Sequence, residues 1–273
     1  MSEFAGKVCV VTGAASGIGR AISVELASMG AILAISDIDE VGLQETRRLL
    51  QMPETNSLMV DKLDVSQPDE ILAYAERVKS ALGSVDCIFN VAGLTRIGTF
   101  ATSDVASFEK IMDVNFWGVV RLTKAMLPHL IESKGRIVNI SSIFGIIGYE
   151  GQSHYCSSKF AVRGFSETIA SELSVHGVSV TSVHPGGVDT NIVRLAEVDT
   201  LPSGVSSKSD VENRFKNAAK TSPKKAAEII LHGAAKRRRR VLVGGDARIV
   251  SLVQRLFPER YNAILSRLFA RVT

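Results

Sequence analysis

The chain has 273 residues, 45% of them hydrophobic and 22% charged, proportions typical of a soluble globular protein. This length is enough to bury a sizeable core in one large domain. The sequence lacks the run of about 18 apolar residues that a membrane-spanning helix needs, and we expect no signal peptide. The chain has three cysteines, Cys9, Cys87 and Cys156, which are far apart in the sequence. An odd number of widely spaced cysteines favours a reduced, cytoplasmic compartment over a disulfide framework.

The positive charge lies at the C-terminus. Residues 236–273 hold ten lysines and arginines against two acidic residues, whereas the rest of the chain carries a net charge of −4. The run 236–240 (KRRRR) could meet nucleic acid or an anionic membrane, but a run this short is more often a solvated turn. We therefore predict no nucleic-acid partner.

Alternating apolar segments predict an α/β protein. Strands are expected at residues 7–12, 31–36, 57–63, 85–90, 136–141 and 178–184, with a short seventh at 241–243. Helices are expected after the first strand up to residue 30 and at 41–51, 68–82, 103–134, 153–175 and 223–235. This alternation predicts a doubly wound parallel sheet (Rossmann fold) with helices on both faces. We assign residues 1–245 to one catalytic domain and 246–273 to an amphipathic helical extension interrupted at Pro258.

A glycine-rich turn follows the first strand, with Gly13, Gly17 and Gly19 spaced G-x-x-x-G-x-G and a helix directly after it. Glycines let the backbone approach a pyrophosphate, and the helix N-terminus offers unpaired N–H groups. A plain structural turn is the alternative. Strand, glycine turn and helix together favour a dinucleotide site.

Asp37 stands at the end of the second strand, 18 residues after Gly19. A carboxylate there accepts hydrogen bonds from both adenosine ribose hydroxyls and repels a 2′-phosphate. It therefore predicts NAD rather than NADP, although an acidic helix cap is an alternative role. Asp64, followed by Val65, ends the third strand, where its carboxylate could reach the adenine amino group.

The segment from Ser142 to Lys159 carries the candidate chemistry. Tyr155 and Lys159 are four residues apart on a predicted helix, so their side chains share one face. An ammonium beside a phenol favours the phenolate, so we expect Lys159 to lower the pKa of Tyr155. Ser142 could place its hydroxyl on the same substrate oxygen. Asn115, inside a predicted helix, would need several hydrogen-bond partners if buried.

These motifs together resemble the short-chain dehydrogenase/reductase family over residues 5 to about 190. The matching segments are TGAASGIG (12–19), LDV (63–65), NVAG (90–93), VN (114–115), ISS (140–142), YCSSK (155–159) and PGGVDT (185–190). One departure is Val91, where many members have a second asparagine, so contacts at this position are expected through the backbone.

The resemblance implies roles for individual residues. Tyr155 would be the general acid/base, Ser142 would polarise the substrate carbonyl, and Asn115 would hold a water of the proton relay. Lys159 would lower the tyrosine pKa and hold the nicotinamide ribose. The implied cofactor-binding set is Gly13, Ser16, Gly17, Ile18, Gly19, Asp37, Asp64, Val65, Asn90, Ala92, Gly93, Tyr155, Lys159, Pro185, Gly186, Val188 and Thr190. No metal site is predicted, because the five histidines show no ligand pairing.

Three loops beyond the strand ends, at 94–100, 143–152 and 191–225, are expected to choose the substrate. Their apolar residues predict a hydrophobic secondary alcohol or ketone, with the third loop as a mobile lid. Some of these side chains could instead pack against the C-terminal residues or a partner subunit. The substrate-pocket candidates are Leu94, Ile143, Phe144, Tyr149 and Ile192.

Other interpretations remain open. The extension could be a lid, a subunit contact or a peripheral membrane anchor, and the first two are favoured because it is short and interrupted by proline. The resemblance also suggests a homodimer or homotetramer, with Phe116 and Trp117 as candidates for the contact. A reductase of 3-oxoacyl or other small carbonyl substrates using NADPH is an alternative activity. A non-catalytic NAD-binding protein is less favoured.

Overall fold

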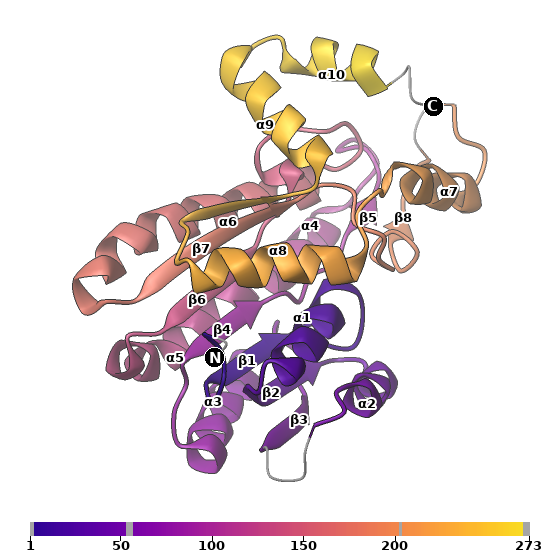
Figure 1. The fold of residues 1–273 in the computed structure, drawn as a ribbon. Helices are drawn as coiled ribbons and strands as arrows, with labels where there is room; N and C mark the ends of the chain where they lie inside the picture. The colour runs from indigo at the N-terminus through magenta and orange to yellow at the C-terminus, as the bar shows by residue number, and fades with distance from the viewer. Residues whose placement is uncertain (1–2, 53–56, 202–203, 270–273) are drawn as a thin grey trace.

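The computed structural model describes residues 3–52, 57–201 and 204–269, with side chains up to residue 267. A central sheet has helices on both faces (Figure 1). Its seven strands are β1 (Val8–Thr12), β2 (Ile32–Asp37), β3 (Leu58–Lys62), β4 (Cys87–Asn90), β6 (Arg136–Ile140), β7 (Ser179–Pro185) and β9 (Arg240–Val243).

The strands are all parallel and lie in the order β3-β2-β1-β4-β6-β7-β9. Chain order reverses between β1 and β4, which creates a crevice outside the carboxyl ends of these strands. The predicted doubly wound parallel sheet is therefore confirmed, and each predicted strand overlaps an observed one.

The helices cover both faces of the sheet. They are α1 (Gly17–Ser28), α2 (Glu40–Leu49), α3 (Pro68–Leu82), α4 (Val105–Met112), α5 (Gly118–Ser133), α6 (Ser153–Glu172), α7 (Lys208–Ala218), α8 (Pro223–Ala235), α9 (Gly245–Leu256) and α10 (Tyr261–Phe269). Apolar side chains of α1, α2 and α8 form the core on one face, and those of α3, α5 and α6 form the core on the other. Figure 1 shows α1 and α8 side by side across the first of these faces.

Sequence pattern explains these helices locally. In α3, Pro68 starts the helix, Ile71, Ala75 and Val78 place buried apolar groups on one face, and Gly83 ends it with a positive φ of 75°. Proline suits the first helical turn and glycine suits the left-handed cap. This helix closes the core beside β1 and β4.

The predicted helical region 103–134 is confirmed, because α4 and α5 follow one another without a break in the helical backbone. A π-helical turn, Asp113–Trp117, separates α4 from α5 and contains Asn115. Such turns are rare and are frequently found at functional sites.

The predicted loop 191–225 contains secondary structure of its own. It holds the short strand β8 (Glu197–Val198), paired with β5 (Arg96–Ile97), and then α7. Leu195, one of the apolar residues of this loop, is exposed. In the extension, α9 ends at Leu256 and α10 begins at Tyr261, so the predicted interruption at Pro258 is confirmed. The expected apolar side chains of residues 268 and 269, and residues 270–273, lie outside the described part.

Candidate active site

The glycine turn after β1 leads directly into the N-terminus of α1. Gly13 and Gly17 have positive φ values of 67° and 52°, which side chains rarely adopt. A Cβ on Gly19 would overlap the carbonyl oxygen of Gly13, so the turn is tight as well. Ser16 caps α1 without using its hydroxyl, and the first turn, which includes Ile18, holds no acidic residue. The free N–H groups and the hydroxyl of this helix N-terminus suit an anionic group such as a pyrophosphate.

Two carboxylates lie at the ends of neighbouring strands. Asp37, the last residue of β2, accepts hydrogen bonds from the backbone N–H groups of Ala15 (2.9 Å) and Asp39 (3.0 Å). The Asp37 carboxylate is therefore fixed against the glycine turn. Asp64 accepts from the N–H and hydroxyl of Ser66 at 2.9 and 2.7 Å, and Val65 beside it is buried.

The segment after β4 is held against the glycine turn by Thr12. Its hydroxyl accepts from the N–H groups of Val91 (3.1 Å) and Ala92 (3.2 Å). The Asn90 side chain is buried and donates to Asn139 Oδ1 at 2.7 Å. This side chain joins β4 to β6, and a contact between Asn90 and a cofactor stays a prediction.

The catalytic candidates meet just beyond the sheet. Ser142 follows β6, and its side chain lies close enough to the Tyr155 phenol to lower the pKa of that tyrosine. Tyr155 and Lys159 both belong to α6, and Lys159 Nζ lies 5.6 Å from the centroid of the Tyr155 ring. Lys159 Nζ also donates to the carbonyl of Ile140 at 3.0 Å. Two separate sequence motifs thus converge on one point.

Burial dominates the acid–base properties of this cluster. Burial raises the pKa of Tyr155 from 10 to about 12, and the hydrogen bond with Ser142 offsets part of this rise. Burial likewise lowers the pKa of Lys159 from 10.5 to about 8. The expectation that Lys159 lowers the pKa of Tyr155 is not met in this structure, because desolvation of the phenol outweighs any benefit from the ammonium. At neutral pH, Tyr155 is therefore a proton donor.

Asn115 connects three elements of the site. Its Oδ1 accepts from the N–H of Leu94 at 2.8 Å, and its Nδ2 donates to the Leu94 carbonyl (2.9 Å) and to Ser158 Oγ (3.0 Å). These bonds supply the reason for a buried asparagine within a helical region. A Cβ on Gly93 would lie 3.1 Å from Asn115 Oδ1 and 3.3 Å from Lys159 Nζ, so the backbone comes close to both. The water-relay role of Asn115 stays a prediction.

Ser142 is supported from behind by His184, a residue without an assigned role in the sequence. His184 lies in β7, and its Nδ1 is 3.1 Å from the Ser142 carbonyl oxygen, while its Nε2 is 3.1 Å from Ser182 Oγ. Burial lowers the pKa of His184 to about 4, although the hydrogen bond with Ser142 acts in the opposite direction. The imidazole is thus a neutral brace for the backbone of Ser142.

Because His184 is buried in its neutral form, we predict that the free energy of unfolding depends on pH. Between pH 6.5 and 4 the unfolded chain binds a proton at His184 that the folded chain resists, so the free energy of unfolding falls as the pH drops. We expect His184 to contribute about 2 kcal/mol of this fall by pH 5. Denaturant unfolding at pH 7 and pH 5 should show a smaller fall for His184→Gln than for the wild type. His176→Gln, at an exposed histidine, should follow the wild type. Equal falls in all three proteins would contradict the assignment.

The segment after β7 lies beside the glycine turn. A Cβ on Gly17 would come within 3.1 Å of Thr190 Cγ2, which places Thr190 against the start of α1. Val188 is buried and bridges to Thr221. The candidates Pro185, Gly186, Val188 and Thr190 thus occupy the same edge as the glycine turn.

Asp246 ties this segment to the C-terminal extension. The N–H of Gly187 donates to Asp246 Oδ2 at 2.6 Å, and a Cβ on Gly186 would overlap the same carboxylate. Asp246 belongs to the first turn of α9. The extension is therefore anchored directly to the candidate cofactor site.

The substrate-pocket candidates form an apolar, aromatic wall. Phe144 packs edge-on against the Tyr155 ring, with centroids 6.3 Å apart and an interplanar angle of 87°. It also stacks on Tyr149 at 4.9 Å and 14°. Ile143 packs partly buried beside them. Leu94 and Ile192 are half-buried on neighbouring loops.

A charged clasp holds the loop that carries Ile192. Arg96 Nε donates to both carboxylate oxygens of Asp199 at 2.8 Å, and Arg96 also pairs with Glu197. The Ser103 hydroxyl donates to Asp199 at 2.6 Å. These bonds hold the predicted lid at Glu197 and Asp199. The acidic residues of the loop therefore have a structural role, which the composition of the loop did not indicate.

Metal ligands are not gathered at this site. In the part of the chain that the structure describes, no three His, Cys, Asp or Glu side chains are grouped so that they could hold a metal ion.

Fold and site together define a Rossmann-type protein with a Ser-Tyr-Lys cluster at the carboxyl edge of its sheet. Residues 7–200 match the short chain dehydrogenase family. The chain belongs to the short-chain dehydrogenase/reductase family of oxidoreductases.

Known relatives cover most of the chain. A protein named "Putative oxidoreductase SadH" from Mycobacterium tuberculosis is 44% identical over 97% of this chain and 96% of its own length. The 3-oxoacyl-acyl-carrier-protein reductase FabG of Thermotoga maritima is 36% identical over 68% of this chain and 75% of its own length. A short chain dehydrogenase/reductase from Burkholderia phymatum, solved in complex with NAD, superimposes with a TM-score of 0.83 at 26% identity over 95% of this chain and 96% of that one.

Proposed function

We propose that this protein transfers a hydride between a nicotinamide cofactor and a hydrophobic secondary alcohol or ketone. The observation that carries the proposal is the convergence of Ser142, Tyr155 and Lys159, with Lys159 Nζ 5.6 Å from the Tyr155 ring centroid, at the same sheet edge as the glycine turn. This arrangement provides a proton donor and a second hydroxyl for one substrate oxygen.

The glycine turn fits the cofactor. The open N-terminus of α1 would hold the pyrophosphate, Asp37 the adenosine ribose, and Lys159 and Thr190 the nicotinamide end. The Burkholderia phymatum relative bound to NAD supports this class of cofactor. When bound, the nicotinamide supplies or accepts the hydride. Asp37 favours NAD over NADP.

The protein residues handle the proton. In reduction, the Tyr155 and Ser142 hydroxyls would hydrogen-bond the carbonyl oxygen, and Tyr155 would give its proton to that oxygen as the C–H bond forms. A pKa of about 12 keeps Tyr155 protonated and ready for this step at neutral pH. In oxidation, Tyr155 would first have to be in its phenolate form, which Lys159 beside the ring would stabilise, and the phenolate oxygen would then accept the alcohol proton.

The wall beside Tyr155 supports an apolar substrate. Phe144 and Tyr149 stack on each other and Phe144 contacts the Tyr155 ring, so a substrate carbon skeleton at this point meets aromatic and aliphatic surface. Burial of apolar surface would bind a hydrophobic ligand more strongly than a polyol.

A substrate scan tests the function. We expect NAD reduction at 340 nm with alicyclic or lipid-derived secondary alcohols to have a kcat/KM about 100-fold above that with polyols, because each buried methylene contributes roughly 0.8 kcal/mol. A higher efficiency with polyols would contradict the substrate class. Cofactor binding without turnover of any alcohol or ketone would favour a non-catalytic NAD-binding protein.

A 3-oxoacyl reductase is the second candidate, favoured by the similarity to the FabG protein of Thermotoga maritima. Turnover of 3-oxoacyl thioesters with NADPH, at a higher kcat/KM than alicyclic ketones with NADH, would select this alternative.

We also propose a homodimer or homotetramer built on α4, α5 and α6. Trp117 and Phe160 are exposed aromatic residues in this region, and Phe116 packs against Trp117 and Phe165. Exposed aromatic side chains are typical of protein interfaces.

A further inference from the structure

Helices α9 and α10 use one side to cover the candidate substrate wall. Val250 of α9 and Leu265 of α10 are buried against Ile146 and Ile147, in the segment that follows Ser142. The Tyr261 hydroxyl also accepts a hydrogen bond from the Gly148 N–H at 3.1 Å. Figure 1 shows this yellow pair at one end of the molecule, beyond α6 and α8.

The opposite side of α9 presents a second apolar surface, which we name the outer stripe. Ile249, Leu252 and Leu256 are spaced by three and four residues, so they share one face of the helix, and Phe257 follows directly. These four side chains are between 48% and 60% exposed. One short helix thus has a buried apolar face and an exposed one.

Arginines border the outer stripe. Arg248 and Arg255 are seven residues apart on α9, on the flank next to Leu252, and Arg260 and Arg267 follow. Among the residues that the structure describes, no ion pair joins these four arginines to a carboxylate. Of the two acidic residues in 245–269, Asp246 is bonded to Gly187. The surface around the stripe is therefore strongly positive.

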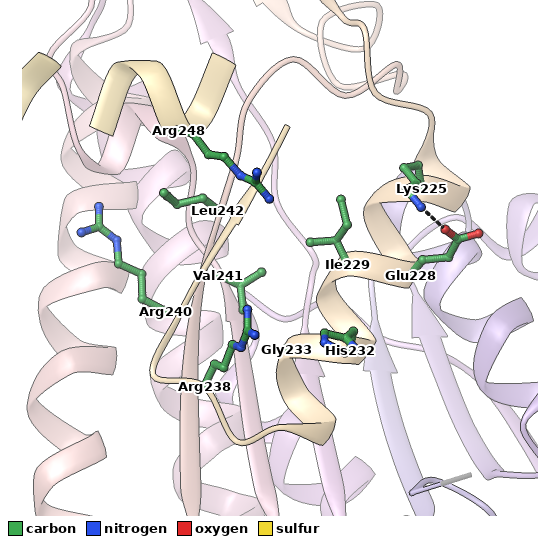
Figure 2. Close-up of a pocket in the computed structure, with 10 residues that line it drawn as sticks. All are labelled: Lys225, Glu228, Ile229, His232, Gly233, Arg238, Arg240, Val241, Leu242 and Arg248. Carbon is green, nitrogen blue, oxygen red and sulfur yellow. Dashed lines mark hydrogen bonds and ion pairs between the residues drawn. The ribbon is translucent and has the colours of Figure 1, made fainter. Parts of the chain in front are cut away.

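A neighbouring hollow of about 560 Å³ continues this positive surface along β9, the edge strand of the sheet. Arg238, Arg240 and Arg248 are among the residues that line it, and Figure 2 shows Val241 on the β9 side and Ile229 on the α8 side. Across the hollow, Lys225 is paired with Glu228 at 2.7 Å. Arg248 joins the hollow to the outer stripe.

We propose that the outer stripe and its arginines dock this protein peripherally on an anionic lipid bilayer. Apolar side chains flanked by arginines match the boundary between acyl chains and phosphate headgroups. Arginine also binds phosphate oxygens in a bidentate manner. None of the described helices could cross a bilayer, so the contact is with one leaflet.

A second copy of the chain fits this surface less well. A two-fold interface centred on the stripe would place Arg248 and Arg255 of each copy near those of the other. Only Glu259 remains on this segment to compensate them. Like charges in such an interface repel, whereas anionic headgroups neutralise them.

Docking at this surface would place the substrate wall next to the lipid. The buried side of the same helices covers the segment after Ser142, and Phe144 of that segment contacts Tyr155. Resting on the proposed function, a hydrophobic alcohol or ketone dissolved in the bilayer would reach the site from the membrane side.

Vesicle flotation of the full chain tests the proposal without using catalysis as the readout. We expect flotation with phosphatidylcholine vesicles containing 30 mol% phosphatidylglycerol, little with pure phosphatidylcholine, and a decrease at high salt. Arg248→Gln with Arg255→Gln should lower partitioning roughly 10- to 30-fold, since each interfacial arginine contributes about a factor of five. Leu252→Asn with Leu256→Asn should lower it by about 10-fold or more.

Matched controls come from α2 and α3. Leu72→Asn changes a leucine as exposed as Leu252, at 57%, and Arg47→Gln with Arg48→Gln removes two exposed charges elsewhere. Both controls should float like the wild type. The proposal fails if the wild type does not float with anionic vesicles, or if the stripe and arginine variants float as well as it does. A loss of oligomer mass by light scattering in the Leu252/Leu256 variant, with no flotation of the wild type, would assign the surface to a second copy.

Discussion

Tyr155→Phe is expected to lower kcat by about 10²- to 10⁴-fold, the usual contribution of a positioned general acid or base. The ring would keep its edge-on contact with Phe144 at 6.3 Å, so the fold and the substrate wall should survive. What is lost is the hydroxyl beside Ser142 that would give the proton. Stopped-time assays with the best alcohol of the scan, and NADH fluorescence titration, would measure turnover and cofactor binding separately.

Tyr149→Phe is the matched control for this prediction. Tyr149 stacks on Phe144 in the same wall. Its side chain is exposed, and it is Phe144, not Tyr149, that packs against the Tyr155 ring. Its loss of a hydroxyl should change kcat by about twofold or less, because no proton step depends on it. Cofactor affinity should stay unchanged in both variants. A kcat in Tyr155→Phe equal to that of the wild type would contradict the proposed mechanism.

Local patterns predict most of the fold. Apolar β-branched runs indicate the strands, and the spacing of Gly13 to Gly19 alone indicates the glycine turn. Because the carboxyl ends of parallel strands meet at one edge, the positions of Ser142 and Tyr155 in the chain predict that they lie close together. These inferences depend on short segments of sequence and on the general geometry of doubly wound sheets.

Contacts between distant residues could not be predicted in the same way. Asp246 meets Gly187, and Arg96 meets Asp199, across loops whose paths no local pattern fixes. Asn115, within the π-helical turn, bonds to the backbone of Leu94, which is also distant in sequence. Each of these contacts is determined by tertiary packing and not by local sequence.

The pKa of Tyr155 likewise depends partly on local sequence and partly on the whole fold. Spacing places Lys159 one turn away, and this is correct, but the sign of the shift depends on how much water reaches the phenol. Burial is a property of the whole fold, and here it raises the pKa of Tyr155 and lowers that of Lys159. A charged ligand beside the pair would act on the same balance, so the free protein sets only the starting point.

Asp37→Asn is expected to reduce the preference for NAD over NADP by about 10- to 100-fold. A hydrogen bond from a ribose hydroxyl to a carboxylate contributes roughly 1.5 to 3 kcal/mol, against roughly 0.5 to 1.5 kcal/mol for one to a neutral amide, and the carboxylate also repels a 2′-phosphate. The amide keeps one oxygen that can accept from Ala15 or Asp39, so the loop loses only about 1 kcal/mol of support. The ratio of kcat/KM for NAD to that for NADP, measured with one alcohol, gives the result.

Asp64→Asn separates this effect from a general loss of negative charge. Asp64 also follows a strand at this edge, but its carboxylate is bonded to Ser66 and is expected near the adenine rather than the ribose. Neutralising it should leave the NAD/NADP ratio within about threefold of the wild type, because solvent and salt screen a charge that does not contact the 2′-phosphate. An equal change in both variants would show that the field of the whole edge, and not Asp37, selects the cofactor. An unchanged ratio in Asp37→Asn would place the ribose elsewhere.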